Sequence, residues 1–393
     1  MAAPPLTLYV HFPWCVAKCP YCDFNSHALQ DELPAERYLA ALLEDLRGWP
    51  AEYRRRPLQS VFLGGGTPSL FPAALLERLL NGIADACALA DEVEITLEAN
   101  PGTVEHDAFA GYRAAGINRL SLGVQSFADA QLRALGRIHS SADAVRAFEA
   151  ARAAGLDNIN VDLMYALPDQ TLAGAEADIY RAIELQPEHV SHYHLTLEPN
   201  TVFYARPPVL PAADVAWDMQ TACADRLAAA GYEHYEVSAW ARPGRSCGHN
   251  RNYWSYGDYL AIGAGAHAKV TAADGTVLRA VRAAHPRAFE RQLATDGGAR
   301  LLPVPPAERP FEFMLNALRL RQGASVVDYR ARTGLDLQAL EPGLAAAVAA
   351  GLLEPVDSGV LRATARGWRF LDDLQALFLP AVADQARGSA RGP

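Results

Sequence analysis

The chain has 393 residues, of which 50% are hydrophobic and 20% are charged. This composition excludes a disordered protein, because disordered chains combine low hydrophobicity with high charge. The formal net charge of −10 argues against a nucleic-acid partner, since nucleic acids are bound through basic surfaces. The first residues lack the basic segment of a signal peptide, and no run of apolar residues is long enough to span a bilayer. We therefore expect a cytoplasmic protein without a transmembrane segment.

Short β-rich runs alternate with Ala- and Leu-rich stretches over residues 1–237. The expected strands lie at residues 6–12, 60–64, 92–99, 119–125, 158–165 and 189–197. Apolar residues at three-to-four-residue spacing predict helices between them. Repeated βα units build a parallel sheet that curls toward a barrel, so we predict an α/β fold with a partial (β/α)6-type barrel and additional strands. Functional residues of such folds lie at the carboxyl ends of the strands.

The rest of the chain is expected to form smaller units. Residues 238–305 contain the motif HNRNYW and are expected to close the barrel. Residues 306–380 combine helical patterns with one strand-like stretch at 351–364, which predicts a small, mostly helical C-terminal domain with a hairpin. Residues 381–393 are polar and Gly-containing and are expected to form a flexible tail.

Three cysteines follow the first expected strand with the spacing C-x3-C-x2-C. Cys15, Cys19 and Cys22 are close enough in sequence to bind one metal centre. An iron–sulfur cubane normally takes four cysteines, so three would leave one iron open to another ligand. A structural zinc site completed by His11 or His27 remains an alternative. The scattered cysteines are expected to be small buried hydrophobic residues, namely Cys87, Cys223 and Cys247.

Further motifs follow the next expected strands. The run GGGTP follows the second strand, and its glycines would let a ligand approach the backbone and its N–H groups. Glu98 and Gln125 end the third and fourth strands on the same side of the sheet. Asp162 interrupts an apolar run, where a carboxylate needs either a ligand or an ion pair. Arg137 could supply that ion pair or bind a carboxylate of a ligand.

Together these motifs resemble those of radical S-adenosylmethionine (SAM) proteins, and more narrowly the oxygen-independent coproporphyrinogen III oxidase (HemN-like) family with its heme chaperone branch. The resemblance is carried by YVHFPWCVAKCPYC, GGGTPS, LEANP, LGVQSF, LGRIH, NVDLMYALPDQT and HNRNYW. It implies a [4Fe-4S] cluster on the three clustered cysteines, with SAM on the open iron. It also implies SAM contacts from Tyr9, Gly65, Gly66, Thr67, Glu98, Gln125, Arg137 and Asp162.

Two features set the chain apart from the decarboxylating oxidases of that family. Those enzymes have another cysteine two residues after the triad, where this chain has Phe24, and a longer segment before it. The motif HNRNYW instead marks the heme chaperone branch. Its candidate heme-binding residues are His249, Asn250, Tyr253 and Trp254. Histidine is a common axial ligand of heme iron and aromatic rings can pack on the macrocycle, although a purely structural loop remains an alternative.

The resemblance therefore predicts a heme chaperone rather than an enzyme, with heme, heme-accepting proteins such as respiratory enzymes, and a reductant for the cluster as partners. One alternative is a coproporphyrinogen III oxidase that cleaves SAM. Another is a zinc-stabilised interaction protein. His192 and His194 share one side of the sixth expected strand, and the pattern leaves open whether they line a cavity or pack in the core.

Overall fold

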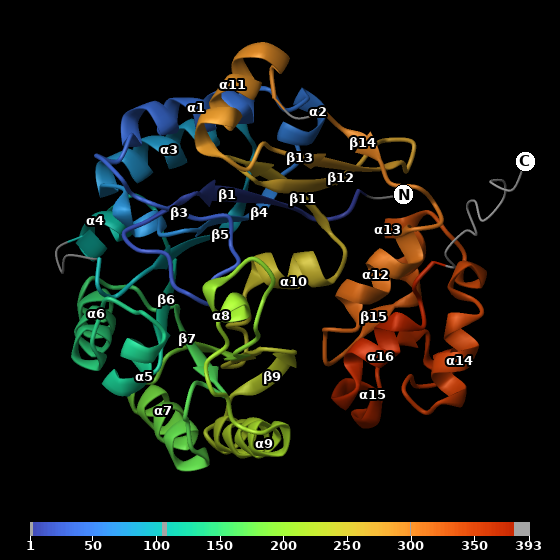
Figure 1. The fold of residues 1–393 in the computed structure, drawn as a ribbon. Helices are drawn as coiled ribbons and strands as arrows, with labels where there is room; N and C mark the ends of the chain where they lie inside the picture. Colours follow the sequence, from blue (N-terminus) through green and yellow to red (C-terminus); the bar gives the residue numbers. More distant parts are fainter. Residues whose placement is uncertain (1–2, 104–107, 299, 381–393) are drawn as a thin grey trace, which may run out of the picture.

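The computed structural model describes residues 3–103, 108–298 and 300–380. A large curved sheet with helices on its outer face stands beside a smaller helical domain (Figure 1). The sheet has 12 strands in the order β14-β13-β12-β11-β1-β4-β5-β6-β7-β8-β10-β9. The parallel centre consists of β11 (Asp258–Ile262), β1 (Leu6–Phe12), β4 (Leu58–Gly65), β5 (Leu89–Ala99), β6 (Arg119–Gln125), β7 (Ile159–Tyr165) and β8 (His189–His194). These strands confirm the predicted ones within a few residues, and with them the partial α/β barrel.

The edges of the sheet are antiparallel. One edge is formed by β12 (His267–Thr271), β13 (Val277–Val281) and β14 (Leu302–Pro303), and the other by β10 (Ala239–Ala241) and β9 (Glu233–Glu236). In the described part of the chain the barrel stays open, because β14 and β9 lie at opposite ends of the strand order. The expectation that residues 238–305 close the barrel is therefore wrong: their strands pair with both edges without joining them.

Amphipathic helices cover the outer face of the sheet. They are α1 (Ala35–Arg47), α2 (Ala51–Arg54), α3 (Ala73–Ala86), α4 (Ala108–Ala114), α5 (Asp129–Ala134), α6 (Ser141–Ala153), α7 (Leu172–Leu185), α9 (Ala213–Ala229) and α11 (Pro286–Asp296). The short helix α8 (Val202–Ala205) lies inside this ring of helices, where the N–H of Phe203 donates to the Pro20 carbonyl at 2.9 Å (Figure 1). In α3, Leu76, Leu79, Leu80 and Ile83 are buried at helical spacing. Strands such as β1 are buried along nearly their whole length, as expected for parallel strands under helices. None of the described helices is long and apolar enough to cross a membrane.

The C-terminal domain has its own hydrophobic core around Phe313, Tyr329 and Leu353. Its elements are α12 (Arg309–Ala317), β15 (Ala324–Ser325), α13 (Val326–Thr333), α14 (Gly343–Ala349), β16 (Val360–Leu361), α15 (Ala365–Arg369) and α16 (Leu371–Ala376). An antiparallel bridge joins Leu353 to Ala363, so the predicted hairpin is present. The predicted tail, residues 381–393, lies outside the described residues.

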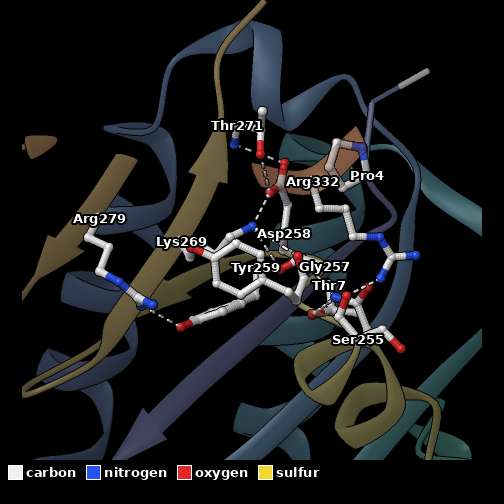
Figure 2. A network of polar contacts seen from close by, with 12 residues as sticks. Pro4, Thr7, Ser255, Gly257, Asp258, Tyr259, Lys269, Thr271, Arg279 and Arg332 are labelled. Carbon is white, nitrogen blue, oxygen red and sulfur yellow. Dashed lines mark hydrogen bonds and ion pairs between the residues drawn. The ribbon is translucent and has the colours of Figure 1, made fainter. Parts of the chain in front are cut away.

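A buried charge network ties this domain to the edge of the sheet (Figure 2). The Asp258 carboxylate has no exposed surface and accepts hydrogen bonds from Lys269 at 2.9 Å and from Arg56 at 2.8 Å. Close by, Arg279 of β13 pairs with Glu312 of α12 at 2.8 Å. Arg332 of α13 donates to the Ser255 carbonyl. These contacts hold the C-terminal domain against the start of β11.

Candidate functional site

A cavity opens at the carboxyl ends of β4 to β8, where the sequence predicts function. It brings together most of the predicted cluster and SAM residues, namely Cys15, Cys19, Cys22, Gly65, Gly66, Thr67, Glu98, Gln125, Arg137 and Asp162. Tyr9 does not line it and lies in the barrel interior, where its hydroxyl donates to His11 Nδ1 at 3.0 Å. The strands thus gather residues that are far apart in sequence at one end of the barrel.

The cysteines lie on a loop whose base is closed by two short paired strands, β2 (Trp14–Cys15) and β3 (His27–Ala28). The N–H of Cys22 donates to the carbonyl of Cys19 at 3.1 Å, which bends the loop between them. All three thiols are partly exposed to the cavity. Burial raises the pKa of the Cys15 and Cys22 thiols and so disfavours their thiolate forms. A bound metal would supply the positive charge that favours deprotonation.

The two histidines named in the zinc alternative differ: the buried Nε2 of His27 has no hydrogen-bond partner, whereas His11 is fully engaged. His11 uses both ring nitrogens within the fold, because Nε2 donates to the Asn25 carbonyl at 2.8 Å while Nδ1 accepts from Tyr9. Among the residues that the structure describes, no group of three His, Cys, Asp or Glu side chains is placed to hold one metal ion. An iron–sulfur cubane makes a different demand, since each thiolate binds a different iron.

The glycine run packs tightly against the cysteine loop. The N–H of Gly66 donates to the Phe12 carbonyl at 2.6 Å, and that of Thr67 to the Trp14 carbonyl at 2.8 Å. A Cβ atom at Gly66 would lie 2.5 Å from the Trp14 carbonyl oxygen, so only glycine fits there. The N–H of Gly65 donates to Glu98 at 3.0 Å. The expectation that this run exposes its N–H groups to a ligand is therefore wrong, because the fold itself uses them.

Two carboxylates form the deep side of the cavity. Asp162 accepts hydrogen bonds from Ser121 at 2.9 Å and from Asn160 at 2.8 Å. Burial, and then the charge of Asp162, raise the pKa of Glu98 to about 8, and burial also raises the pKa of Asp162. Both carboxyl groups would therefore release their protons more readily when a cation binds beside them.

Arg137 lies near the cysteine loop and does not pair with Asp162. Its guanidinium donates to the Gly123 carbonyl at 2.6 Å and to the Cys19 sulfur at 3.7 Å. The ion-pair explanation of the two residues is thus excluded. A ligand that carries both positive centres and a carboxylate, as SAM does, fits a cavity with acidic groups on one side and a guanidinium on the other.

Gln125 has a backbone conformation that marks it as special. Its φ of 70° lies in the left-handed region, which is rare for residues other than glycine and is enriched at functional sites. The pairing of β6 with β7 shifts register between Gly123 and Gln125. This irregularity ends the strand and directs the chain so that Gln125 lines the cavity.

The HNRNYW motif forms α10 (Gly248–Trp254) at the other end of the barrel. His249 is 7% exposed, and its Nδ1 forms a hydrogen bond of 3.2 Å with the hydroxyl of Ser60, near the start of β4. Its ring centroid lies 4.9 Å from that of Phe62, and burial lowers the pKa of His249 to about 3. Glu94 accepts the N–H groups of Gly248 and His249 at 3.0 and 3.2 Å, which fixes the start of the helix.

The remaining heme candidates pack around the end of α10. Asn250, Tyr253 and Trp254 are partly buried, the ring of Tyr253 lies 4.9 Å from that of Tyr259, and Arg319 stacks 4.2 Å over Trp254. None of the four heme candidates lines the cluster cavity. The structure therefore separates the predicted heme residues from the predicted cluster and SAM residues.

Several cavity residues escape sequence reasoning. Tyr21, Asn100, Tyr193 and Glu198 line the cavity. The position of Tyr193 between two histidines was the available signal, because successive residues of a strand face opposite sides. His194 lines the cavity, whereas His192 does not; both rings stack on Tyr165, with centroids 5.1 and 4.6 Å away.

Both the barrel and the C-terminal domain match known protein families. The Radical SAM superfamily model matches residues 9–179, and the HemN C-terminal domain model matches residues 304–370. The heme chaperone HemW of Escherichia coli (strain K12) is 48% identical over 376 residues, covering 96% of this chain and 98% of that protein. HemW of Haemophilus influenzae is 46% identical over 384 residues, covering 96% and 98%.

Among solved structures, the E. coli coproporphyrinogen III oxidase (HemN), a radical SAM enzyme, superposes with a TM-score of 0.81. The match covers 96% of this chain and 90% of that chain at 24% sequence identity. At this level of identity the similarity shows that the two proteins share a fold.

Proposed function

The chain belongs to the HemW family, and from this premise we propose that it is a heme chaperone, which binds heme and passes it to acceptor proteins. The observation that carries the proposal is 48% identity to a heme chaperone over nearly the full length of both chains. The similarity to coproporphyrinogen III oxidase is weaker in sequence and concerns the fold. Phe24, which is 59% exposed at the cavity, stands where the resemblance expects a further cysteine in the oxidases.

We propose that Cys15, Cys19 and Cys22 bind a [4Fe-4S] cluster and that SAM occupies the adjoining cavity. When bound, the pair supplies one-electron chemistry, for which a reductant is needed. The residues of the chain orient the ligand: Glu98 and Asp162 face its positive centres, and the remaining SAM candidates Tyr9, Gly65, Gly66, Thr67 and Gln125 shape or support the cavity. Arg137 is the matching group for the carboxylate of SAM.

We propose that heme binds at α10 through His249, with Asn250, Tyr253 and Trp254 beside it. The His249 imidazole is neutral at physiological pH, which is the form that ligates iron. Because its ring is buried against Phe62 and bonded to Ser60, ligation requires a shift of α10. We assign one role to each part of the chain. Residues 1–237 bind the cluster and SAM, residues 238–305 contain the heme motif, and residues 306–380 support α10.

The test is an anaerobic heme titration of the cluster-reconstituted protein, followed by the Soret band. We expect saturation near one heme per chain and release of the heme to a heme-free globin. His249→Ala should weaken binding, whereas His192→Ala, a buried histidine that stacks on Tyr165 outside α10, should not. Unsaturable heme binding in the unmodified protein would overturn the proposal. Product formation from coproporphyrinogen III with SAM and a reductant would then favour the oxidase.

A further inference from the structure

A buried arginine stands inside the barrel, between the cluster cavity and α10. Arg119 begins β6 and is only 2% exposed. Its Nε atom is buried without a hydrogen-bond partner, and its guanidinium takes part in none of the ion pairs formed by the described residues. A buried cation is costly unless negative charges compensate for it, so its surroundings must supply them.

Strand register places two carboxyl groups beside it. Arg119 pairs with Thr96 of β5, and Thr96 is flanked on the same face by Glu94 and Glu98 because side chains alternate along a strand. With neighbouring strands about 4.8 Å apart and a rise of about 3.3 Å per residue, such diagonal neighbours lie about 8 Å apart at their Cα atoms, within reach of a long side chain. Arg119 therefore lies between the two glutamates on the inner face of the sheet.

The two glutamates serve different ends of the barrel. Glu98 lines the cluster cavity and accepts the N–H of Gly65 at 3.0 Å. Glu94 accepts the first N–H groups of α10, from Gly248 at 3.0 Å and from His249 at 3.2 Å. A single guanidinium thus lies next to the carboxyl groups that serve both ends.

We propose that Arg119 is a positioning residue for both ends of the barrel: it favours the ionised carboxylate of Glu98 in the cavity, and it holds Glu94 in place as the cap of α10. The first part rests on the proposed function, because the cationic ligand of Glu98 is SAM. The second part concerns the ligand-free protein and is independent of it.

Near neutral pH, Glu98 and Asp162 are the neighbouring groups whose charge depends on Arg119, because the histidines, tyrosines and cysteine nearby stay uncharged. The other groups that face this region are Tyr9 of β1, His189 and Tyr193 of β8, Tyr235 of β9, and Cys247 and His249 at α10. Burial lowers the pKa of both histidines well below neutrality. It raises the pKa of the three tyrosines, and that of Cys247 to about 12, so all of these groups stay uncharged.

The first experiment measures SAM affinity against pH, by equilibrium dialysis of labelled SAM with the cluster-reconstituted protein. We expect binding to weaken as Glu98 becomes protonated, and Arg119→Gln to move the midpoint of this change to higher pH. A shift of one unit corresponds to about a tenfold weaker affinity on the acidic side. Arg119→Lys should restore the original midpoint. Arg152→Gln, which removes an arginine paired with Glu188 elsewhere, is the matched control.

An unchanged midpoint in Arg119→Gln would overturn the first part of the proposal. Absence of SAM binding in the unmodified protein would instead refute the proposed cofactor. If Arg119→Gln does not fold, the charge-balanced variant Arg119→Gln/Glu94→Gln carries the same comparison, because it removes one buried charge of each sign.

The second experiment is amide hydrogen exchange in the ligand-free protein. Loss of Arg119 should loosen Glu94, so we expect faster exchange at Gly248 and His249 in Arg119→Gln and near-normal exchange in Arg119→Lys. Unchanged exchange at these amides in Arg119→Gln would overturn the second part, whatever the protein does with heme or SAM.

Discussion

Replacing Asp258 with asparagine should strongly destabilise the protein, because Lys269 would remain buried without its counter-charge. Both side chains are almost completely excluded from solvent, at 0% and 1% exposed. The Asp258 carboxylate also accepts hydrogen bonds from Arg56 at 2.8 Å and from the hydroxyl of Thr271 at 2.8 Å. The ammonium of Lys269 would then face no negative charge: it would keep uncharged oxygen acceptors, which are the amide oxygen of the new side chain and the carbonyls of Tyr256 and Gly257 at 3.1 and 3.3 Å (Figure 2).

The expected magnitude follows from this geometry. Removing one partner of a buried ion pair costs about 3–5 kcal/mol of unfolding free energy, since the other charge stays desolvated. Lys269→Met should cost less, because Asp258 keeps its partner Arg56, which is 18% exposed and can relax toward water. The double variant Asp258→Asn/Lys269→Met should be more stable than Asp258→Asn alone, because neither charge is then left unpaired.

The pH dependence has a defined sign. Burial opposes ionisation of Asp258, but Lys269 and Arg56 outweigh it and lower the pKa of Asp258 below its usual value. Its contribution is therefore present above the unfolded pKa of about 3.9 and is lost as the pH falls through the lower pKa of the folded state. Asp258→Asn should lack this acid-dependent part.

Urea unfolding followed by tryptophan fluorescence measures these losses. The C-terminal domain and the sheet share the network, so we expect both to unfold at lower urea in Asp258→Asn. The control is Arg78→Gln, which breaks a pair with Glu36 whose side chains are 57% and 69% exposed and should leave the midpoint unchanged. Equal midpoints for Asp258→Asn and the unmodified protein would refute the reasoning.

Three further predictions concern the cavity. Cys15→Ala should abolish the brown absorbance of the reconstituted protein while its far-UV circular dichroism is kept, and a retained absorbance would contradict the ligand assignment. Gly66→Ala should lower the iron content, because the added Cβ would lie 2.5 Å from the Trp14 carbonyl oxygen; iron at the unmodified level would count against a tight loop. Burial and Asp162 raise the pKa of Glu98 to about 8, so the folded protein favours the protonated side chain. The contribution of this protonated form to folding stability is full below pH ~4.3 and is lost as the pH rises through 8. Glu98→Gln should accordingly raise the thermal midpoint of the cluster-free protein at pH 9 but not at pH 4, and equal midpoints at pH 9 would contradict it.

The strands and the cavity could be predicted because their signals are local. Short apolar runs that alternate with helical stretches predicted β1 and β4 to β8 within a few residues, and each motif directly follows its strand. The use of the glycine N–H groups could not be predicted, because it depends on how closely Gly66 packs on the Trp14 carbonyl.

The open sheet and the place of α10 depend on pairing between distant parts of the chain. β11 pairs with β1 across about 250 residues, for example Leu6 with Asp258, and no periodicity of either segment indicates this register. Because Asn252 then bonds Thr7 at the start of β1, α10 covers the amino ends of the strands. A motif placed by such pairing cannot be assigned to the cavity from its residue types alone.

The separation of the two sites limits how the cluster can act on heme. If heme binds at α10, contact between heme and the ligands of the cluster cavity is not direct, so any influence must pass through the barrel interior. The described residues provide a continuous path of hydrogen bonds, since Asn160 donates to Asp162 at 2.8 Å and accepts from His189 at 2.6 Å. The hydroxyl of Tyr235 then donates to His189 at 2.8 Å and accepts the N–H of Cys247, which precedes α10, at 3.3 Å. If this path couples the two sites, SAM must change the affinity for heme by the same factor by which heme changes the affinity for SAM. Titrating each ligand in the presence and absence of the other measures both factors.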